Sequence, residues 1–340
     1  SATTFAAGAG NLRALQLLHE EEFDWHANTC VNAAQFGHIE CLMYAYENGC
    51  HWDDRVHQRA AQNGHINCME YAHKHGLQWP SDVCELAAFQ GHLACLAYAH
   101  ENGGFWDRDT VASAAQNGHI ACLGYALEQG CPHDEKASNM ACLNGHLACL
   151  QLLRLYHSPW DATTSVNAAV CAEADCLRYL HQHGCPWDVR VTTLSAKHGR
   201  IHSLRYALES GCPYTEHLMV YAAFNCLECL QYLVSIQGLY MYERVFMAAL
   251  LYGDVAILKF LVDQYCPYLM ATFSCEEEEI LLYDKVFRRN NPDFALCVAY
   301  AMERGWIPDD HFKRYVISRD ESIDGNFFAK EEWNVRGTKL

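Results

Sequence analysis

Basic residues are scarce in this 340-residue chain. It has 24 lysines and arginines against 41 aspartates and glutamates, which gives a formal net charge of −17. A surface this acidic repels phosphate backbones and anionic lipid headgroups. We therefore expect neither nucleic acid nor a membrane as the main partner. Long apolar runs are also missing, since none reaches the roughly 18–20 residues that a spanning helix needs.

The sequence also lacks the short motifs of common enzymes. It contains no Gly-x-x-x-x-Gly-Lys-Ser/Thr or Gly-x-Gly-x-x-Gly loop, no Gly-x-Ser-x-Gly elbow and no His-Glu-x-x-His helix. The Ser, His and Asp residues that are present follow a repeat, which a catalytic group used once need not do. We therefore expect no enzymatic activity and no cofactor.

The start of the chain carries no targeting signal. Ser1 is followed by neither a charged segment nor an apolar secretory segment. The chain begins without Met and part-way into the repeat described next. We expect a processed form or a fragment of a longer protein.

What the sequence does contain is a repeat with a period of 27 residues, and three markers keep that period. The first is a glycine at Gly10, Gly37, Gly64, Gly91, Gly118, Gly145 and Gly199, with Ala172 in the remaining place. The second is a column at Trp25, Trp52, Trp79, Trp106, His133, Trp160, Trp187, Tyr214, Met241 and Tyr268. The third is Gly-Cys or Gly-Cys-Pro at 49–50, 130–132, 184–186 and 211–213. Such self-similarity is the signature of a solenoid.

Each unit predicts a helix, a turn and a second helix. In the unit around Gly64, Asp53 is a good N-cap for a first helix over 54–62. Gly64 can take the left-handed conformation that ends this helix. Residues 66–74 then place apolar side chains at a spacing of three, on one helical face. No single unit can bury both helices, so neighbouring units must supply the core.

The repeated core resembles that of ankyrin repeats. The segments 33–42, 60–69, 87–96 and 114–123 each carry Ala-Ala-x-x-Gly-His followed by an apolar helix. The resemblance covers roughly residues 2 to 265. It implies an all-α, ankyrin-like helical repeat solenoid of about 10–11 helix-turn-helix units, and it implies a role in protein binding.

The sequence departs from the ankyrin pattern in its links. The usual period is 33 residues, whereas a link such as Cys50-His51-Trp52 is too short for the family's β-hairpin finger. The leading Thr-Pro-Leu-His element is also absent. We expect the fingers to be shortened or absent. This compact variant is similar to repeats encoded by giant viruses of amoebae and by some protists.

A repeated His-x-x-Cys, as in His65 and Cys68, permits a metal hypothesis. A zinc site gathers about four ligands, whereas each unit offers two, and helices pack about 8–10 Å apart. We therefore interpret the Cys as small apolar core residues and the His as turn residues that hydrogen-bond the backbone between units. No metal is expected.

The 19 cysteines are also unlike a disulfide framework. Equivalent cysteines such as Cys41, Cys68 and Cys95 are separated by a whole repeat, while bridged Cα atoms must lie within about 7 Å. We expect free thiols and a cytoplasmic or other reducing intracellular compartment. The Trp column permits a ligand platform, but one regular structural role favours a packing staple before each first helix.

Candidate partner-binding residues lie on the first helices, where exposed side chains differ from unit to unit. They are Arg55, Gln58, Arg59, Asp82, Glu85, Arg108, Asp109, Ser113, Lys136, Asn139, Arg190 and Thr193. In ankyrin-like stacks the first helices line the concave side, so the resemblance implies that these residues face a partner. The alternative is a solvated face without a partner.

The repeat becomes irregular toward the C-terminus. We expect repeats over 1–268, a divergent repeat and cap over 269–318, and a tail over 319–340. The acidic run 276–279 fits the start of a longer helix ending near 289, with a partner helix over 294–303 and a cap over 311–317. Phe327, Phe328 and Trp333 could dock the tail.

These observations favour a non-catalytic scaffold or adaptor that binds a protein, with a viral factor acting on host proteins as the candidate setting. The alternative is a structural component of a virion or other large assembly. An enzyme or metalloprotein built on His and Cys is the third hypothesis.

Overall fold

The computed structural model describes residues 1–224, 226–237, 244–246, 248–249 and 255–261. The chain divides into two compact units, Ser1–Thr215 and Glu216–Leu340. The segments predicted at 276–289, 294–303, 311–317 and 319–340 lie outside the described residues, as does the boundary expected at 268.

Unit 1 consists of paired helices, and the pairs follow the 27-residue period. The helices are α1 Ala2–Gly8, α2 Leu12–Glu20, α3 Thr29–Gln35, α4 Ile39–Glu47, α5 Arg55–Asn63, α6 Ile66–Lys74, α7 Val83–Gln90, α8 Leu93–Glu101, α9 Arg108–Gln116, α10 Ile120–Glu128, α11 Glu135–Leu143, α12 Leu147–Leu155, α13 Ala162–Val170, α14 Asp175–Gln182, α15 Val189–Lys197 and α16 Ile201–Glu209. Unit 2 adds α17 Leu218–Ala222 and α18 Leu227–Gln237. The predicted all-α repeat fold is confirmed, and no described residue is in a strand.

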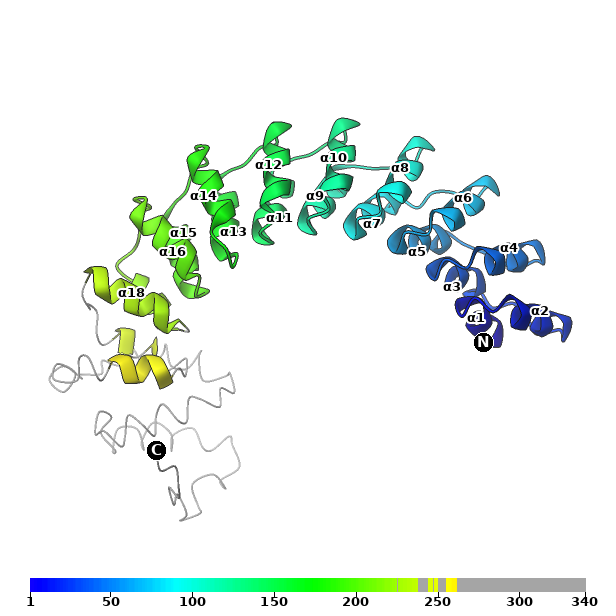
Figure 1. Cartoon of the computed structure of the whole chain (residues 1–340), viewed down its shortest axis with the longest axis horizontal. Helices are drawn as coiled ribbons and strands as arrows, with labels where there is room; N and C mark the ends of the chain where they lie inside the picture. The colour runs from blue at the N-terminus through cyan, green and yellow to red at the C-terminus, as the bar shows by residue number, and fades with distance from the viewer. Residues whose placement is uncertain (225, 238–243, 247, 250–254, 262–340) are drawn as a thin grey trace, which may run out of the picture. The chain divides into compact units, whose positions relative to one another are not determined.

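Within unit 1 the helices form two rows. Each odd-numbered helix from α1 to α15 packs on the next odd-numbered helix, and the even-numbered helices do the same from α2 to α14. Figure 1 shows the odd-numbered row on the inside of a curve between α3 and α14, with the even-numbered row outside. The first helices therefore line the inner side of this unit, as the resemblance implied.

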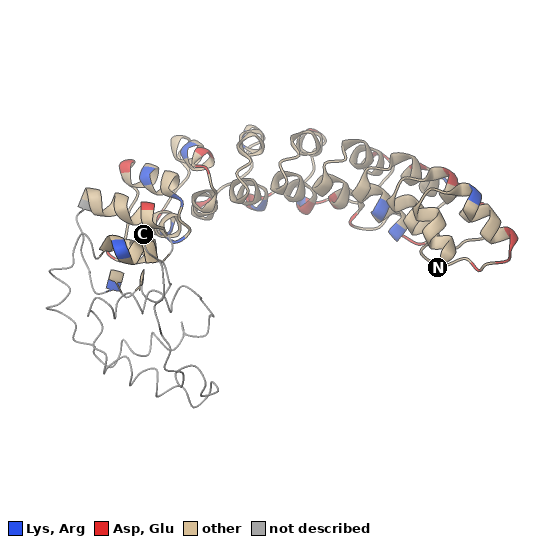
Figure 2. Ribbon diagram, turned by 60° about the horizontal axis from the view of Figure 1, so that its bottom comes forward, with Lys and Arg blue, Asp and Glu red and all other residues tan. Residues whose placement is uncertain are grey.

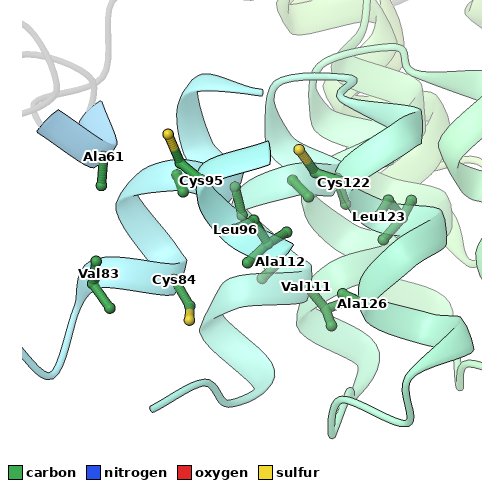
Figure 3. Packing of buried hydrophobic residues seen from close by; sticks show 14 of the residues in the cluster. Ala61, Val83, Cys84, Cys95, Leu96, Val111, Ala112, Cys122, Leu123 and Ala126 are labelled. Atoms are coloured by element: carbon green, nitrogen blue, oxygen red, sulfur yellow. The ribbon is translucent and has the colours of Figure 1, made fainter. Parts of the chain in front are cut away.

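Small residues bring the first helices together. Adjacent alanines such as Ala60 and Ala61 are fully buried in the odd-numbered row. The second helices add a column with the same period, made of Leu15, Leu42, Met69, Leu96, Leu123, Leu150, Leu177 and Leu204, each 0% exposed. Figure 3 shows Leu96 beside Val111 and Ala112 of the following first helix. One unit thus completes the core of the next.

Four first-helix caps agree with the predicted chemistry, and in α5 the N-cap is shifted by one residue from Asp53. The equivalent residues Asp107, Asp134, Asp161 and Asp188 are N-caps whose carboxylates accept backbone N–H groups. In α5 the N-cap is Asp54, and the helix runs one residue later than predicted. The Asp53 carboxylate still accepts the Arg55 N–H at 3.1 Å, because the turn before the helix is already helical at Asp54.

The repeated Gly-His element joins consecutive units. A Cβ on Gly37 would lie 2.5 Å from the imidazole of His65, and the same relation holds for Gly10 with His38 and for Gly118 with His146. Burial lowers the pKa of His65, and an interaction with the Gln35 backbone opposes that shift. The His65 ring thus packs against the turn of the preceding unit. Its predicted hydrogen bond to backbone between units stays a prediction.

Candidate interaction surface

The predicted partner-binding residues lie on one row of helices. We call them the inner row: Arg55, Gln58 and Arg59 on α5, Asp82 and Glu85 at α7, Asp109 and Ser113 on α9, Lys136 and Asn139 on α11, and Arg190 and Thr193 on α15. Arg59, Lys136 and Arg190 are exposed, and Ser113 is buried. The remainder are half-buried. Arg108 is exposed on the first residue of α9.

Hydrogen bonds join inner-row residues of neighbouring units. The Gln58 amide donates to both oxygens of Asp82 at 3.0 and 3.1 Å. The Ser113 hydroxyl lies 3.3 Å from a Glu85 oxygen. These partners are 24 and 28 residues apart, close to one repeat. All four residues were expected on this face, but the bonds between them were not predicted.

A third junction is ionic. The Lys136 ammonium lies 2.7 Å from Asp109, and this hydrogen bond raises the pKa of Lys136. One residue earlier, Arg108 forms an ion pair with Asp134 at 3.1 Å. Figure 2 shows basic and acidic residues both occurring along the row of first helices. The face therefore carries both charges.

Two inner-row arginines stabilise the start of their own helix. Arg55 donates to both oxygens of Asp53 and also to the Asn28 side chain at 3.0 Å. Arg190 makes the same contacts with Asp188. These bonds lower the pKa of both aspartates. Arg55 and Arg190 thus stabilise helix caps. The exposed Arg59 side chain instead donates to Gln62, on its own helix, at 2.9 Å.

Asn139 stands apart within the inner row. Its side-chain oxygen is buried and has no hydrogen-bond partner. A buried acceptor without a donor costs about 1–3 kcal/mol. No pattern in the sequence predicts this feature.

The tryptophan column packs against the second helices. Trp52 stacks on Tyr46 at 3.7 Å, and Trp106 stacks on His100 at 3.6 Å. The Trp25 and Trp79 indoles donate to the carbonyls of Asn48 and Asn102 in the following unit. The packing hypothesis is therefore supported for these residues, although the stacking partner lies in the preceding second helix.

The repeated cysteines are small buried groups, and the structure shows a hydrogen-bonding role as well. All 16 cysteines for which the structure gives a state are free thiols. In the Gly-Cys column, the thiols of Cys131 and Cys185 lie 3.2 Å from the carbonyls of Asp107 and Asp161. Ser158 occupies the equivalent place and donates to Asp134. The cysteine here acts as a small donor between units.

Neither a metal cluster nor a spanning helix is found in the described part of the chain. No group of three or more His, Cys, Asp or Glu side chains there could hold a metal ion. Among the same residues, every helix is too short or too polar to cross a bilayer.

Comparisons with known proteins add a distant likeness. No protein-family model matches the sequence, and no curated protein matches it. Among solved structures, the chain is similar to the human ASB11 ankyrin repeat domain, with 20% sequence identity and a TM-score of 0.43. The match covers 47% of this chain and 85% of that chain. The repeat fold described above rests on the observed helix pairs, which are ankyrin-like in their Ala-Ala, Gly-His and second-helix pattern.

Proposed function

We propose that the chain is a non-catalytic scaffold that binds another protein through the inner row. The observation that carries this proposal is the set of hydrogen bonds between neighbouring first helices, from Gln58–Asp82 to Asp109–Lys136. Bonds of this kind restrict side-chain rotamers before a partner arrives. Because ordering a long side chain at an interface costs about 0.5–1.5 kcal/mol, a face that is already ordered binds at lower cost.

The charges of the inner row favour a partner with both charges on its surface. Arg59 and Lys136 are exposed cations, while Asp82 and Glu85 place carboxylates between them along the row. A protein surface offers such a mixture, whereas a polyanion such as nucleic acid does not. The net charge of −17 supports the same choice. The short 27-residue unit supports a virus-encoded factor that binds host proteins, and the many free thiols support a reducing intracellular compartment.

The test is affinity capture with crosslinking, followed by substitution in the inner row. Arg55 and Arg190 hold helix caps, so reversing their charge would disturb folding as well as binding. Arg59→Glu combined with Lys136→Glu is the better variant, because exposed ion pairs contribute only about 0–1 kcal/mol to stability. The matched control reverses two exposed charges on second helices, Glu40→Lys and Glu128→Lys.

We expect crosslinks to the odd-numbered helices and at least a tenfold weaker interaction for the Arg59/Lys136 variant, about 1.4 kcal/mol. The control variant should bind as the unchanged chain does. Crosslinks confined to even-numbered helices, or equal loss in both variants, would contradict the proposal. Capture of further copies of this chain alone would favour the structural-assembly alternative.

A further inference from the structure

Helix α18, in the compact unit Glu216–Leu340, begins with a pair of cysteines. In α4, α6, α8, α10 and α12 the residue before the helix is a histidine, and a cysteine follows three residues later. In α18 the residue before Leu227 is Cys226, and Cys229 follows at the same spacing. The His-x-x-Cys of those five helices is replaced at α18 by Cys-x-x-Cys.

The geometry at this helix start brings the two sulfur-bearing residues together. The backbone N–H of Cys229 donates to the Cys226 sulfur at 3.2 Å, which is the contact that an N-cap side chain makes with the third helical residue. Cys226 is half-buried, whereas Cys229 is 0% exposed. Cys226 is therefore the more accessible of the two residues.

These contacts stabilise a thiolate at Cys226. The hydrogen bond from Cys229, with the backbone N–H groups of Cys229 and Glu228, lowers the pKa of Cys226 to about 7. The same pairing raises the pKa of Cys229. Elsewhere burial has the opposite effect, since it raises the pKa of Cys122 to about 11. At neutral pH Cys226 has thiolate character that Cys122 lacks.

Two other cysteine pairs are in contact but differ in access. The Cys30 thiol lies 4.0 Å from the Cys50 carbonyl. Interaction within each pair raises the pKa of Cys30 and Cys142 and lowers the pKa of Cys50 and Cys176. All four of these residues are buried. A reagent from solvent therefore reaches the α18 pair more readily than either of them.

We propose that Cys226 and Cys229 form a redox-active dithiol that hydrogen peroxide converts to a disulfide. In the first step the Cys226 thiolate attacks one peroxide oxygen, and the O–O bond breaks. Hydroxide leaves and takes a proton from solvent, and Cys226 becomes a sulfenic acid.

In the second step the Cys229 sulfur attacks the Cys226 sulfur, and the S–O bond breaks. The departing hydroxide takes the Cys229 thiol proton and leaves as water. Two thiols and one peroxide thus give one disulfide and two waters. A dithiol reductant reverses the reaction by thiol–disulfide exchange. The disulfide would tie the residue before α18 to its first turn.

The test uses the full chain and two mass-spectrometric measurements. In the first, limiting iodoacetamide at pH 7 labels the native chain. We expect Cys226 to be alkylated at least about tenfold faster than Cys122, because the thiolate is the reactive form. In the second, stoichiometric hydrogen peroxide is added. We expect the peptide that carries both cysteines to lose two hydrogens and to regain them with dithiothreitol.

Three variants identify the role of each sulfur. Cys226→Ser keeps a good helix cap and should abolish both the fast alkylation and the disulfide. Cys226→His restores the residue of the other units and should do the same. Cys229→Ser should leave a sulfenic acid on Cys226 that dimedone traps. The proposal is overturned if Cys226 reacts no faster than Cys122, or if peroxide leaves both thiols free or oxidises Cys226 without forming the bridge. Circular dichroism of each variant checks that the helices remain.

Discussion

At the scale of single residues, the glycines of the two repeated columns differ in their surroundings. Gly118 and Gly130 both have a positive φ, of 74° and 75°. At Gly118 an added Cβ would lie 2.7 Å from the His146 ring, whereas at Gly130 nothing lies within 4 Å. Glycine is thus required twice at Gly118, for its backbone conformation and for the space that the next unit fills.

Gly118→Ala should therefore be more destabilising than Gly130→Ala. The left-handed conformation alone costs about 1–2 kcal/mol for a residue with a Cβ, and that cost applies to both variants. The contact with His146 should add about 1–3 kcal/mol at Gly118. Chemical denaturation of both variants measures the difference. Equal losses would mean that the imidazole moves aside freely, and Gly118→Ala combined with His146→Ala tests that directly.

His57 is a buried histidine with a structural role. It is 0% exposed, its Nδ1 lies 3.1 Å from the Gln78 carbonyl, and its Nε2 has no hydrogen-bond partner. Burial is the main cause that lowers the pKa of His57 to about 4. The folded chain therefore holds His57 neutral where an unfolded chain, with a pKa near 6.5, would already protonate it.

This difference predicts a loss of stability in acid. Between pH 6.5 and 4 the unfolded chain binds more protons than the folded chain, so the contribution of His57 decreases as pH falls, by up to about 3 kcal/mol. The control is His57→Thr, because Thr192 in the equivalent place bonds the Pro213 carbonyl. Urea unfolding at pH 7, 5.5 and 4 should show the stability of the unchanged chain relative to His57→Thr shrinking toward pH 4. Parallel pH profiles would assign the acid sensitivity to other groups.

At the scale of helices, each second helix stabilises the units on both sides of it. Leu123 on α10 is 0% exposed, while Ile120 on the same helix is 48% exposed. The two residues differ in what they contact rather than in apolar character. The helix packs into the core through one face, which carries Cys122, Leu123, Ala126 and Leu127.

Leu123→Ala should cost about 2–5 kcal/mol, because it removes a buried side chain and leaves a cavity between units. Ile120→Ala on the same helix should cost about 1 kcal/mol or less, as is usual for surface positions. Thermal or denaturant unfolding compares the two. A loss below about 1 kcal/mol for Leu123→Ala would count against a stacked core.

At the scale of unit 1, the contacts between a turn glycine and the histidine of the next repeat are interrupted at one turn. The turn between α13 and α14 carries Ala172 and Glu173 where the turns at Gly37, Gly64, Gly91, Gly118 and Gly145 have Gly-His. The Cys171 sulfur lies over Gly145 in place of an imidazole. In the following repeat Arg200 occupies the histidine position, and its side chain donates to the Val170 carbonyl at 2.7 Å.

We expect local opening to begin at this turn. Amides of 171–175 should exchange with solvent at least about tenfold faster than those of 117–121, which corresponds to about 1.4 kcal/mol less local stability. Native-state hydrogen exchange compares the two turns within one molecule. Equal protection would show that Cys171 and Arg200 replace the histidine fully.

The sequence by itself determined the unit, the helix pair within it and much of the core. Ile120 is an exception, because it continues the spacing of Leu123 and Ala126 yet is 48% exposed. These features depend on local propensities and on the repeat period, and both are visible along the chain. Gly64 ends a helix, and a large apolar residue occurs at the position of Leu123 every 27 residues. The inner-row residues were also correctly placed on the first helices. Their identification as a binding surface stays a prediction.

Only the tertiary structure decided which side chains meet. The Gln58–Asp82 bond, the His65 ring over Gly37 and the unpartnered oxygen of Asn139 depend on the rotation and spacing between neighbouring units, which no local pattern encodes. The same is true of chemical reactivity. Cys122 and Cys226 belong to one residue type, yet their pKa values separate because one is enclosed by apolar helices and the other caps a helix beside a second thiol.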